Sequence, residues 1–306
     1  MSPLPHFDAQ AITQALSMAD AIAALHHAFQ NLGPLHPRTQ IPLGPTDDLL
    51  LMPAVTPQGI GIKTVTVVSD NPAKGLPLIH AHYLLCDRQT GQPLATFDGS
   101  ALTALRTPAA SGVATQILAQ PDATTLGIFG TGIQAVGHLE AMLSVRHAID
   151  TIWVTGRTPA ASEAFVTRFA QDSYQLLTAP AAQTATADII CGCTSSVNPV
   201  IPTASIKPGA HINLVGSYSA ARREVDVDLI ATASVYVDER EAAQVEAGEL
   251  IAAATGSWSF DQIAGDLAEL TTGQVGRQNN DQITLFKSVG LAVEDVVVAA
   301  AVLAAQ

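Results

Sequence analysis

Residues 124–143 read TTLGIFGTGIQAVGHLEAML, and this stretch decides the fold. An apolar strand at 125–129 leads into Gly130-x-Gly132-x-x-Ala135, which opens a helix at 134–144. In the dinucleotide fingerprint the first glycine makes the tight turn, the second lets a pyrophosphate approach the backbone, and the third position permits close helix–strand packing. The helix N-terminus adds amide donors for the phosphates. We therefore predict that Gly130 and Gly132 bind a dinucleotide; the alternative is a glycine turn with only a structural role.

Downstream of this turn, short apolar strands alternate with helical segments. Strands are predicted at 125–129, 151–154, 174–177, 188–191, 212–215 and 234–237, with helices at 134–144 and 160–171 between them. Such alternation is typical of a doubly wound parallel sheet. The fold class predicted for this part of the chain is therefore α/β, with a Rossmann domain.

The residues before the turn follow a different pattern. A helix is predicted over 8–33, short strands and loops in the Pro-rich stretch to Pro57, strands at 60–68, 78–86 and 93–98, and an Ala-rich helix at 102–118. These elements indicate a mixed α/β sheet domain. The last helix, at 289–305, is almost wholly apolar, so we expect it to be buried on this first domain or at a subunit interface.

Composition excludes several classes of protein. A chain of 306 residues suits two domains, and 48% apolar with 13% charged residues argues against disorder. No apolar run reaches the length of about 18 residues that a membrane span needs, and Met1–Gln10 lacks signal-peptide features, so a cytoplasmic protein is expected. The net charge of −13 argues against nucleic acid or an anionic membrane as partner.

Cysteines and a histidine pair offer no strong metal signal. Cys86, Cys191 and Cys193 fit neither a disulfide framework nor a four-ligand zinc pattern, and are predicted to be small buried residues on strands. His80 and His82 share one face of a strand and could bind a metal or carry protons. Because no third ligand is near in sequence, core histidines and no metal are predicted.

The end of the second Rossmann strand indicates the cofactor. It reads Gly156-Arg157-Thr158, and no acid follows before Glu163. An acid at this place would bind the ribose hydroxyls of NAD, whereas a guanidinium and a hydroxyl suit a 2′-phosphate. Arg157 and Thr158 therefore predict NADPH. If Arg157 is only a solvated surface residue, NADH is used as well.

Four cations of the first domain stand out in a chain so poor in them: Arg38, Lys63, Lys74 and Arg106. Lys63 lies on an apolar strand and Arg106 in an Ala-rich helix, and a charge in such surroundings is rarely left unpaired. One hypothesis is a pocket for a substrate carboxylate, anchored by a bidentate guanidinium. The alternative is ordinary ion pairing or snorkelling of each side chain.

Taken together, these motifs resemble the ornithine cyclodeaminase/mu-crystallin family over nearly the whole chain. The resemblance rests on Lys63, on Asn71-Pro72-x-Lys74-Gly75-Leu76-Pro77, on Asp98-Gly99, and on LTALRTPAAS, GTGIQA and ITLFKSVGLAVEDV. It implies a Rossmann domain at 119–285, inserted in an α/β substrate-binding and dimerisation domain made of 1–118 and 286–306. A homodimer is implied as well.

The resemblance also implies roles for particular residues. Arg38, Lys63 and Arg106 would bind the substrate carboxylate, with Lys63 and Arg106 as catalytic residues. Cofactor contacts are implied for a longer set: Arg106, Gly130, Gly132, Ile133, Gln134, Arg157, Thr158, Thr194, Val215 and Ser288.

One departure from the family pattern points to the reaction. The cyclodeaminases carry a catalytic aspartate after the strand equivalent to HINLVG, and here Tyr218 occupies that position. The segment VGSYSAARREVD resembles that of bacterial reductases of cyclic imino acids. The resemblance therefore implies NAD(P)H-dependent reduction of Δ1-pyrroline-2-carboxylate to L-proline and of Δ1-piperideine-2-carboxylate to L-pipecolate.

In this mechanism the cations orient the small anionic imine for hydride transfer, and Lys63 or a water supplies the proton. Three other enzyme activities remain open within the family: an amino-acid dehydrogenase, an acyclic imine reductase and an ornithine cyclodeaminase. A different class is a non-catalytic, NADPH-dependent binding protein, as mu-crystallins exemplify.

Overall fold

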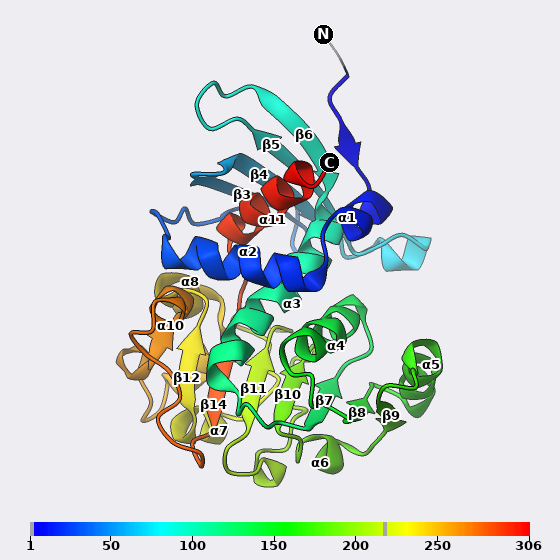
Figure 1. Ribbon diagram of the computed structural model, residues 1–306, viewed down its shortest axis with the longest axis vertical. Coiled ribbons are helices and arrows are strands. Elements are labelled where there is room, and N and C mark those ends of the chain that lie inside the picture. The colour runs from blue at the N-terminus through cyan, green and yellow to red at the C-terminus, as the bar shows by residue number, and fades with distance from the viewer. Residues whose placement is uncertain (1–2, 217–218) are drawn as a thin grey trace. The chain divides into compact units, whose positions relative to one another are not determined.

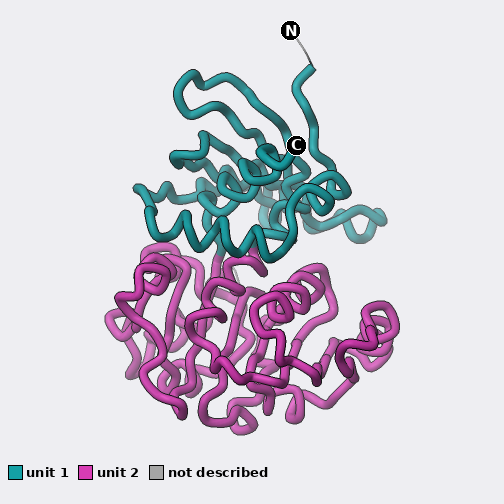
Figure 2. The backbone as a smooth tube through the Cα atoms, viewed as in Figure 1, with its two compact units in different colours: residues 1–106, 290–306 teal, residues 107–289 magenta. Residues whose placement is uncertain are grey.

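A computed structural model describes residues 3–216 and 219–306, which form two compact units (Figure 2). Unit 1 contains residues 1–106 and 290–306, and unit 2 contains residues 107–289. The chain passes from unit 1 to unit 2 inside one continuous helix, α3 (Gly99–Leu118), and re-enters unit 1 at Gly290. The limits predicted from the sequence, 118 and 286, fall instead at the end of that helix and inside a strand.

Unit 2 is built on one eight-stranded sheet in which every neighbouring pair is parallel (Figure 1). Its strand order is β13-β12-β14-β11-β10-β7-β8-β9. In chain order the strands are β7 (Thr125–Phe129), β8 (Thr151–Thr155), β9 (Gln175–Thr178), β10 (Ile189–Gly192), β11 (His211–Leu214), β12 (Ser234–Val237), β13 (Gly265–Asp266) and β14 (Thr284–Lys287). The order β9-β8-β7-β10-β11 is that of a doubly wound Rossmann sheet, so the predicted fold class is confirmed.

Helices connect these strands, and they follow the predicted alternation. They are α4 (Ile133–Val145), α5 (Pro159–Phe169), α6 (Ala181–Thr184), α7 (Val227–Thr232), α8 (Arg240–Glu246), α9 (Gly248–Ala253) and α10 (Leu267–Thr271), with 3-10 turns η2 (Thr203–Ser205) and η3 (Phe260–Gln262). The predicted set of strands lacks β14, which is buried along its whole length between β11 and β12. Its sequence, TLFK, ends in a charged residue, which interrupts the apolar run by which a short buried strand is recognised.

Unit 1 contains a six-stranded sheet of order β1-β6-β5-β4-β3-β2. The strands are β1 (His6–Phe7), β2 (Thr39–Pro42), β3 (Asp48–Thr56), β4 (Gly59–Val67), β5 (Ile79–Cys86) and β6 (Pro93–Asp98), with the 3-10 turn η1 (Pro72–Lys74) before β5. Strands β2 to β6 pair antiparallel, and β1 joins β6 in parallel. The apolar C-terminal helix α11 (Ala292–Ala304) packs on β3 and β4, which confirms that it is buried on the first domain.

The N-terminal helix predicted over 8–33 is two helices, α1 (Ala9–Ala15) and α2 (Met18–Gln30). Leu16 is extended and ends α1, and the Ser17 hydroxyl then caps α2 by accepting a hydrogen bond from the Asp20 amide at 3.1 Å. Both segments keep apolar residues at helical spacing, so the break is visible only in the capping residue. Within the described residues, no helix has the length and apolar character needed to cross a bilayer.

Candidate active site

Three of the four cations singled out in the sequence come from three segments of unit 1, and two of them pair with buried acids. Lys63 lies in the middle of β4, Arg106 in α3, and Arg38 just before β2. The Lys63 ammonium is 2.7 Å from Asp295 Oδ2 and also donates to the Thr103 hydroxyl at 3.1 Å. Lys63 is thus ion-paired with Asp295. Ion pairing was the alternative to a pocket for a substrate carboxylate.

Arg106 is held by the same helix that holds Lys63. Its Nη1 donates to Glu294 Oε2 at 2.8 Å, and its Nε lies 3.6 Å from Asp295 Oδ1. Glu294 and Asp295 belong to the first turn of α11, where the helix dipole favours negative charge, and both are fully buried. Lys63 and Arg106 thus pair with two buried carboxylates, and Arg38 lies close enough to Lys63 for their like charges to repel. Ammonium and guanidinium donors gathered in this way suit an anionic group of a ligand.

Burial changes the proton affinity of Lys63. Desolvation lowers the pKa of its ammonium to about 8, with Arg106 and Arg38 adding repulsion, while the Asp295 carboxylate opposes the shift. A lysine of this kind is largely charged at neutral pH and can still release a proton near it. The site therefore offers both a positive anchor and a proton donor.

Gly290 shapes the backbone beside the two arginines. Its φ of +83° is in the left-handed region, and an added Cβ would lie 2.2 Å from Arg106 Nη1. The Gly290 carbonyl accepts a hydrogen bond from Arg38 Nη2 at 2.6 Å. Only glycine combines this conformation with so close an approach of a guanidinium.

The Gly130 turn of unit 2 has the geometry that a dinucleotide requires. Gly130 has a φ of +110°, and a Cβ there would lie 2.5 Å from the Cys193 carbonyl oxygen. Gly132 is the N-cap residue of α4, and a Cβ added to it would meet no atom within 4 Å. Open space in front of Gly132 and the amides at the start of a 13-residue helix fit a pyrophosphate. Ile133, the first residue of α4, is 64% exposed beside this space.

The end of β8 presents the two residues predicted to choose the cofactor. Arg157 is exposed, and Thr158 is the N-cap residue of α5, where its hydroxyl accepts from the Ala161 amide at 3.2 Å. That hydroxyl keeps its own proton for a further acceptor. The strand end therefore offers an exposed guanidinium and a hydroxyl donor, which fit a phosphate better than a ribose diol.

Thr194, Val215 and Ser288 follow the carboxyl ends of β10, β11 and β14, the edge at which open α/β sheets bind ligands. Thr194 and Ser288 are each hydrogen-bonded to a buried acid. Glu224 accepts from the Thr194 amide and hydroxyl at 2.7 and 2.8 Å. Asp238 accepts from the Ser288 hydroxyl at 3.0 Å.

Other residues named in the sequence analysis lie apart from these groups. Lys74, the fourth cation, is exposed at the end of η1. His80 and His82 are both exposed on β5, so the prediction of core histidines is wrong, because the face of β5 that they share is not covered. The described residues contain no group of three potential metal ligands. Tyr218 lies outside the described residues.

The three cysteines are free, but the prediction of buried strand residues holds fully for Cys191 alone. Cys86 is partly exposed on β5, and Cys193 lies just after the end of β10. Burial raises the pKa of the Cys191 thiol to about 12, so it stays protonated and inert as a nucleophile.

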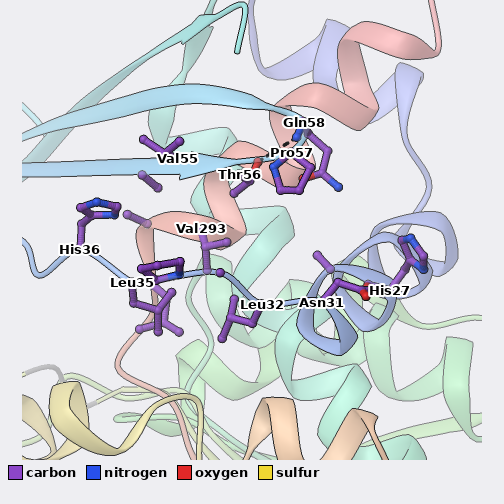
Figure 3. Close-up of a pocket in the computed structure, with 16 residues that line it drawn as sticks. His27, Asn31, Leu32, Leu35, His36, Val55, Thr56, Pro57, Gln58 and Val293 are labelled. Atoms are coloured by element: carbon purple, nitrogen blue, oxygen red, sulfur yellow. Dashed lines mark hydrogen bonds between the residues drawn. The ribbon is translucent and has the colours of Figure 1, made fainter. Parts of the chain in front are cut away.

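A cavity in unit 1 lies elsewhere. It measures about 360 Å³ and is bounded by the end of α2, residues 31–36, the β3–β4 turn and the start of α11 (Figure 3). His27 and His36 line it from different segments, whereas Arg38, Lys63 and Arg106 are absent from its walls. This cavity is therefore separate from the cation cluster.

Four acids were missed by reasoning from the sequence: Glu294, Asp295, Glu224 and Asp238. The signal for the first two was available, because an acidic pair inside the apolar run AVEDVVVAA needs buried cations as much as those cations need acids. Glu224 stands in ARREVD, where neighbouring charges conceal its burial, and no feature of the sequence marks it.

Comparison with known proteins gives consistent matches. The model of the ornithine cyclodeaminase/mu-crystallin family matches residues 7–305. A Δ1-pyrroline-2-carboxylate reductase of Bacillus cereus is 39% identical over 86% of this chain and 83% of its own length. The structure of the Thermococcus litoralis Δ1-pyrroline-2-carboxylate reductase, in complex with NADH and L-proline, superposes with a TM-score of 0.93, at 32% identity and with 99% and 97% of the two chains covered.

A second solved structure is equally similar in fold. It is an archaeal alanine dehydrogenase dimer with bound NAD, with a TM-score of 0.93 and 29% identity over 99% of this chain and 95% of that one.

Proposed function

Because the chain belongs to the ornithine cyclodeaminase/mu-crystallin family, we propose that it is an NAD(P)H-dependent reductase of cyclic imino acids. It converts Δ1-pyrroline-2-carboxylate to L-proline and Δ1-piperideine-2-carboxylate to L-pipecolate. The observation that carries the proposal is the cluster of Lys63, Arg106 and Arg38 beside Gly290 and two buried acids, because its ammonium and guanidinium donors suit the single carboxylate of these substrates. The reductase of Bacillus cereus, similar over most of both chains, supports the choice of reaction.

Each cation has a distinct part in the reaction. Arg106 and Arg38 bind the substrate carboxylate, Arg106 with a guanidinium whose orientation is fixed by Glu294. The Lys63 ammonium adds positive charge, and its lowered pKa of about 8 makes it the proton donor to the imine nitrogen. Asp295 keeps this ammonium in place and restores part of its proton affinity.

The reaction adds a hydride to the imine carbon and a proton to the imine nitrogen, so that C=N becomes CH–NH. A reduced nicotinamide supplies the hydride when it is bound. Protonation of the nitrogen before reduction makes the carbon a better acceptor, and a fixed carboxylate limits the orientations of the ring. The chain contributes binding, orientation and the proton.

For the cofactor we propose contacts from the Gly130–Gln134 turn and from Thr194, Val215 and Ser288, with Arg106 adjoining the cofactor as well as the substrate. Arg157 and Thr158 bind a 2′-phosphate, so NADPH is preferred and NADH is accepted. The Thermococcus litoralis and archaeal proteins are described with NADH and NAD, which supports a nicotinamide cofactor without choosing between the two forms.

We further propose that the protein is a cytoplasmic homodimer in which unit 1, predicted from the sequence as 1–118 and 286–306, is the substrate-binding and dimerisation domain. The dimer is supported by the archaeal alanine dehydrogenase, which is described as one. The net charge of −13 supports a small-molecule partner rather than nucleic acid or an anionic membrane.

The test is an absorbance assay of NADPH oxidation by the purified protein with each cyclic imine, repeated with NADH. Rapid oxidation with a cyclic imine is expected, and the ratio of rates gives ring size and cofactor preference. Failure with both imines, while the protein still binds nucleotide, would refute the proposal.

The second candidate is an alanine dehydrogenase, which the similarity to the archaeal enzyme favours. It predicts NADH or NADPH oxidation with pyruvate and ammonia in place of the imine. Ammonia release from ornithine would instead indicate a cyclodeaminase, and tight nucleotide binding without any turnover would indicate a binding protein.

A further inference from the structure

Glu224 ties together the segments that follow two neighbouring strands of unit 2. Its Oε1 accepts from the Thr194 amide at 2.7 Å and from the Thr194 hydroxyl at 2.8 Å, just after β10. Its Oε2 accepts from the Gly216 amide at 2.8 Å, just after β11. One side chain thus makes three hydrogen bonds across the carboxyl edge of the sheet.

The base of this side chain is itself fixed. The Glu224 amide donates to Glu249 Oε1 at 3.0 Å, and its carbonyl accepts from the Val200 and Ile201 amides at 2.9 and 3.1 Å. Glu224 is fully buried. The carboxylate therefore has a defined position from which to hold the backbone at Thr194 and Gly216.

Close packing leaves this arrangement little freedom. A Cβ on Gly216 would lie 1.9 Å from the Thr194 carbonyl oxygen and 2.6 Å from Glu224 Oε1. A Cβ on Gly192, at the end of β10, would lie 2.9 Å from Glu224 Oε2. Two glycines are thus needed for the strand ends to close around the carboxylate.

We propose that Glu224 is a positioning residue for the dinucleotide, because its carboxylate fixes the backbone after β10 and β11 on which the cofactor contacts Thr194 and Val215 are carried. The inference rests on the proposed dinucleotide binding and extends it to a residue that need not touch the cofactor. It also explains why a carboxylate is buried at a place where a neutral side chain would be easier to desolvate.

The ionised form of Glu224 is the one that fits its surroundings. Both oxygens face hydrogen-bond donors, so a proton on either one displaces an N–H group or turns the Thr194 hydroxyl away. Burial raises the pKa of Glu224 to about 7; Lys287 on β14 lowers it, and Glu249 on α9 raises it. Cys191 and Cys193 also lie within its electrostatic reach and are both held protonated by burial.

The expected consequence is a nucleotide affinity that depends on pH near neutrality. Above about pH 7 the carboxylate is charged and holds both segments, and below it the proton loosens one of them. Loss of a charge-assisted hydrogen bond corresponds to roughly a tenfold change in an equilibrium constant. The dissociation constant of the nucleotide should therefore rise as the pH falls through 7.

The experiment is a fluorescence titration of the full-length protein with NADH and with NADPH, about one pH unit above and below 7. It compares the natural protein with Glu224→Gln, which keeps the shape and places an amide donor against another donor. Asp188→Asn is the matched control: Asp188 accepts from the Thr124 and Thr125 amides at the opposite end of the same sheet, and its pKa of about 2 keeps it charged throughout.

We expect the natural protein to bind both nucleotides about fivefold more weakly at the lower pH, since each form of Glu224 is about nine-tenths populated there, and Glu224→Gln to bind weakly and equally at both pH values. Asp188→Asn should follow the natural profile even if it is less stable. NADH separates this effect from the titration of the 2′-phosphate in NADPH.

A Glu224→Gln variant with natural affinity and an unchanged pH profile would overturn the inference. If that variant does not fold, a flat NADH profile of the natural protein would overturn it equally. Absence of any nucleotide binding by the natural protein is a different result, since it would remove the proposed function and this inference together.

Discussion

Lys63 and Asp295, 232 residues apart in the sequence, form an ion pair with an Nζ–Oδ2 distance of 2.7 Å. The two side chains are 2% and 0% exposed. The pair joins the centre of β4 to the first turn of α11. It therefore holds the C-terminal helix against the sheet of unit 1.

Breaking this pair should destabilise the protein strongly. Lys63→Met leaves the buried Asp295 carboxylate without its nearest counter-charge, and loss of one partner of a buried pair costs about 3–5 kcal/mol. Lys207→Met is the matched control, because Lys207 pairs with Asp188 at 2.6 Å but is 42% exposed. Urea unfolding should show a loss of less than about 1 kcal/mol for this second variant. Equal losses for the two variants would contradict the role given to burial.

Activity should fall as the pH rises through about 8. The pKa of Lys63 is lowered to about 8, so the ammonium that donates the proton and attracts the carboxylate is present below this pH and lost above it. Lys63→Arg keeps the charge but does not release a proton in this range. Profiles of kcat/KM against pH should show the alkaline limb for the natural protein and lack it for the variant. A limb that persists at the same pH in Lys63→Arg would assign it to another group.

Much of unit 2 could be predicted because its strands are apolar. The segments between them contain a glycine turn and apolar residues at helical spacing. β7 and β12 have the predicted limits, and α4 begins within one residue of its predicted start. β14 was missed because its sequence, TLFK, ends in a charged residue, which interrupts the apolar run by which a short buried strand is recognised. The break at Ser17 was missed because one capping hydroxyl ends a pattern that otherwise continues.

The cation cluster could be predicted only in part. Lys63 and Arg106 drew attention because charge is costly among apolar neighbours, and the structure brings both to α11. Their acidic partners lie more than 180 residues away in the chain. No local pattern connects groups so distant, so the ion pairs emerge only from the tertiary fold.

The two glycines of the nucleotide turn should differ when each is replaced by alanine. Gly132→Ala meets no atom within 4 Å, so stability should change by less than about 0.5 kcal/mol, but the methyl group occupies the space that a pyrophosphate needs. Its nucleotide dissociation constant should rise roughly tenfold or more.

Gly130→Ala should instead lower the stability of the protein, since φ is +110° and the Cys193 carbonyl oxygen lies 2.5 Å from the new Cβ. Unfolding curves and nucleotide titrations of both variants distinguish the two effects. An unchanged nucleotide affinity of Gly132→Ala would show that this turn does not bind the pyrophosphate.

Cofactor preference should depend on Arg157. Arg157→Ala removes an exposed guanidinium beside the Thr158 cap, so the KM for NADPH should rise about tenfold while that for NADH stays the same. Arg168→Ala is the control, because Arg168 is in the last turn of α5, the helix that Thr158 caps, and lies over the Phe169 ring instead. Steady-state kinetics with both nucleotides test this. A parallel rise for NADH would show that Arg157 does not recognise the 2′-phosphate.

Gly290→Ala should separate the position of Arg106 from the strain of the backbone. Both Gly290 (φ +83°) and Gly273 (φ +72°) have left-handed conformations, so alanine costs each about 1–2 kcal/mol of strain. A Cβ at Gly290 would also lie 2.2 Å from Arg106 Nη1, whereas one at Gly273 meets no atom within 4 Å. Gly290→Ala should therefore displace the guanidinium and lower kcat/KM for the imine by at least about tenfold. Gly273→Ala should lose stability alone. If the two variants keep the same imine kinetics, the guanidinium held beside Gly290 is not the anchor of the substrate carboxylate.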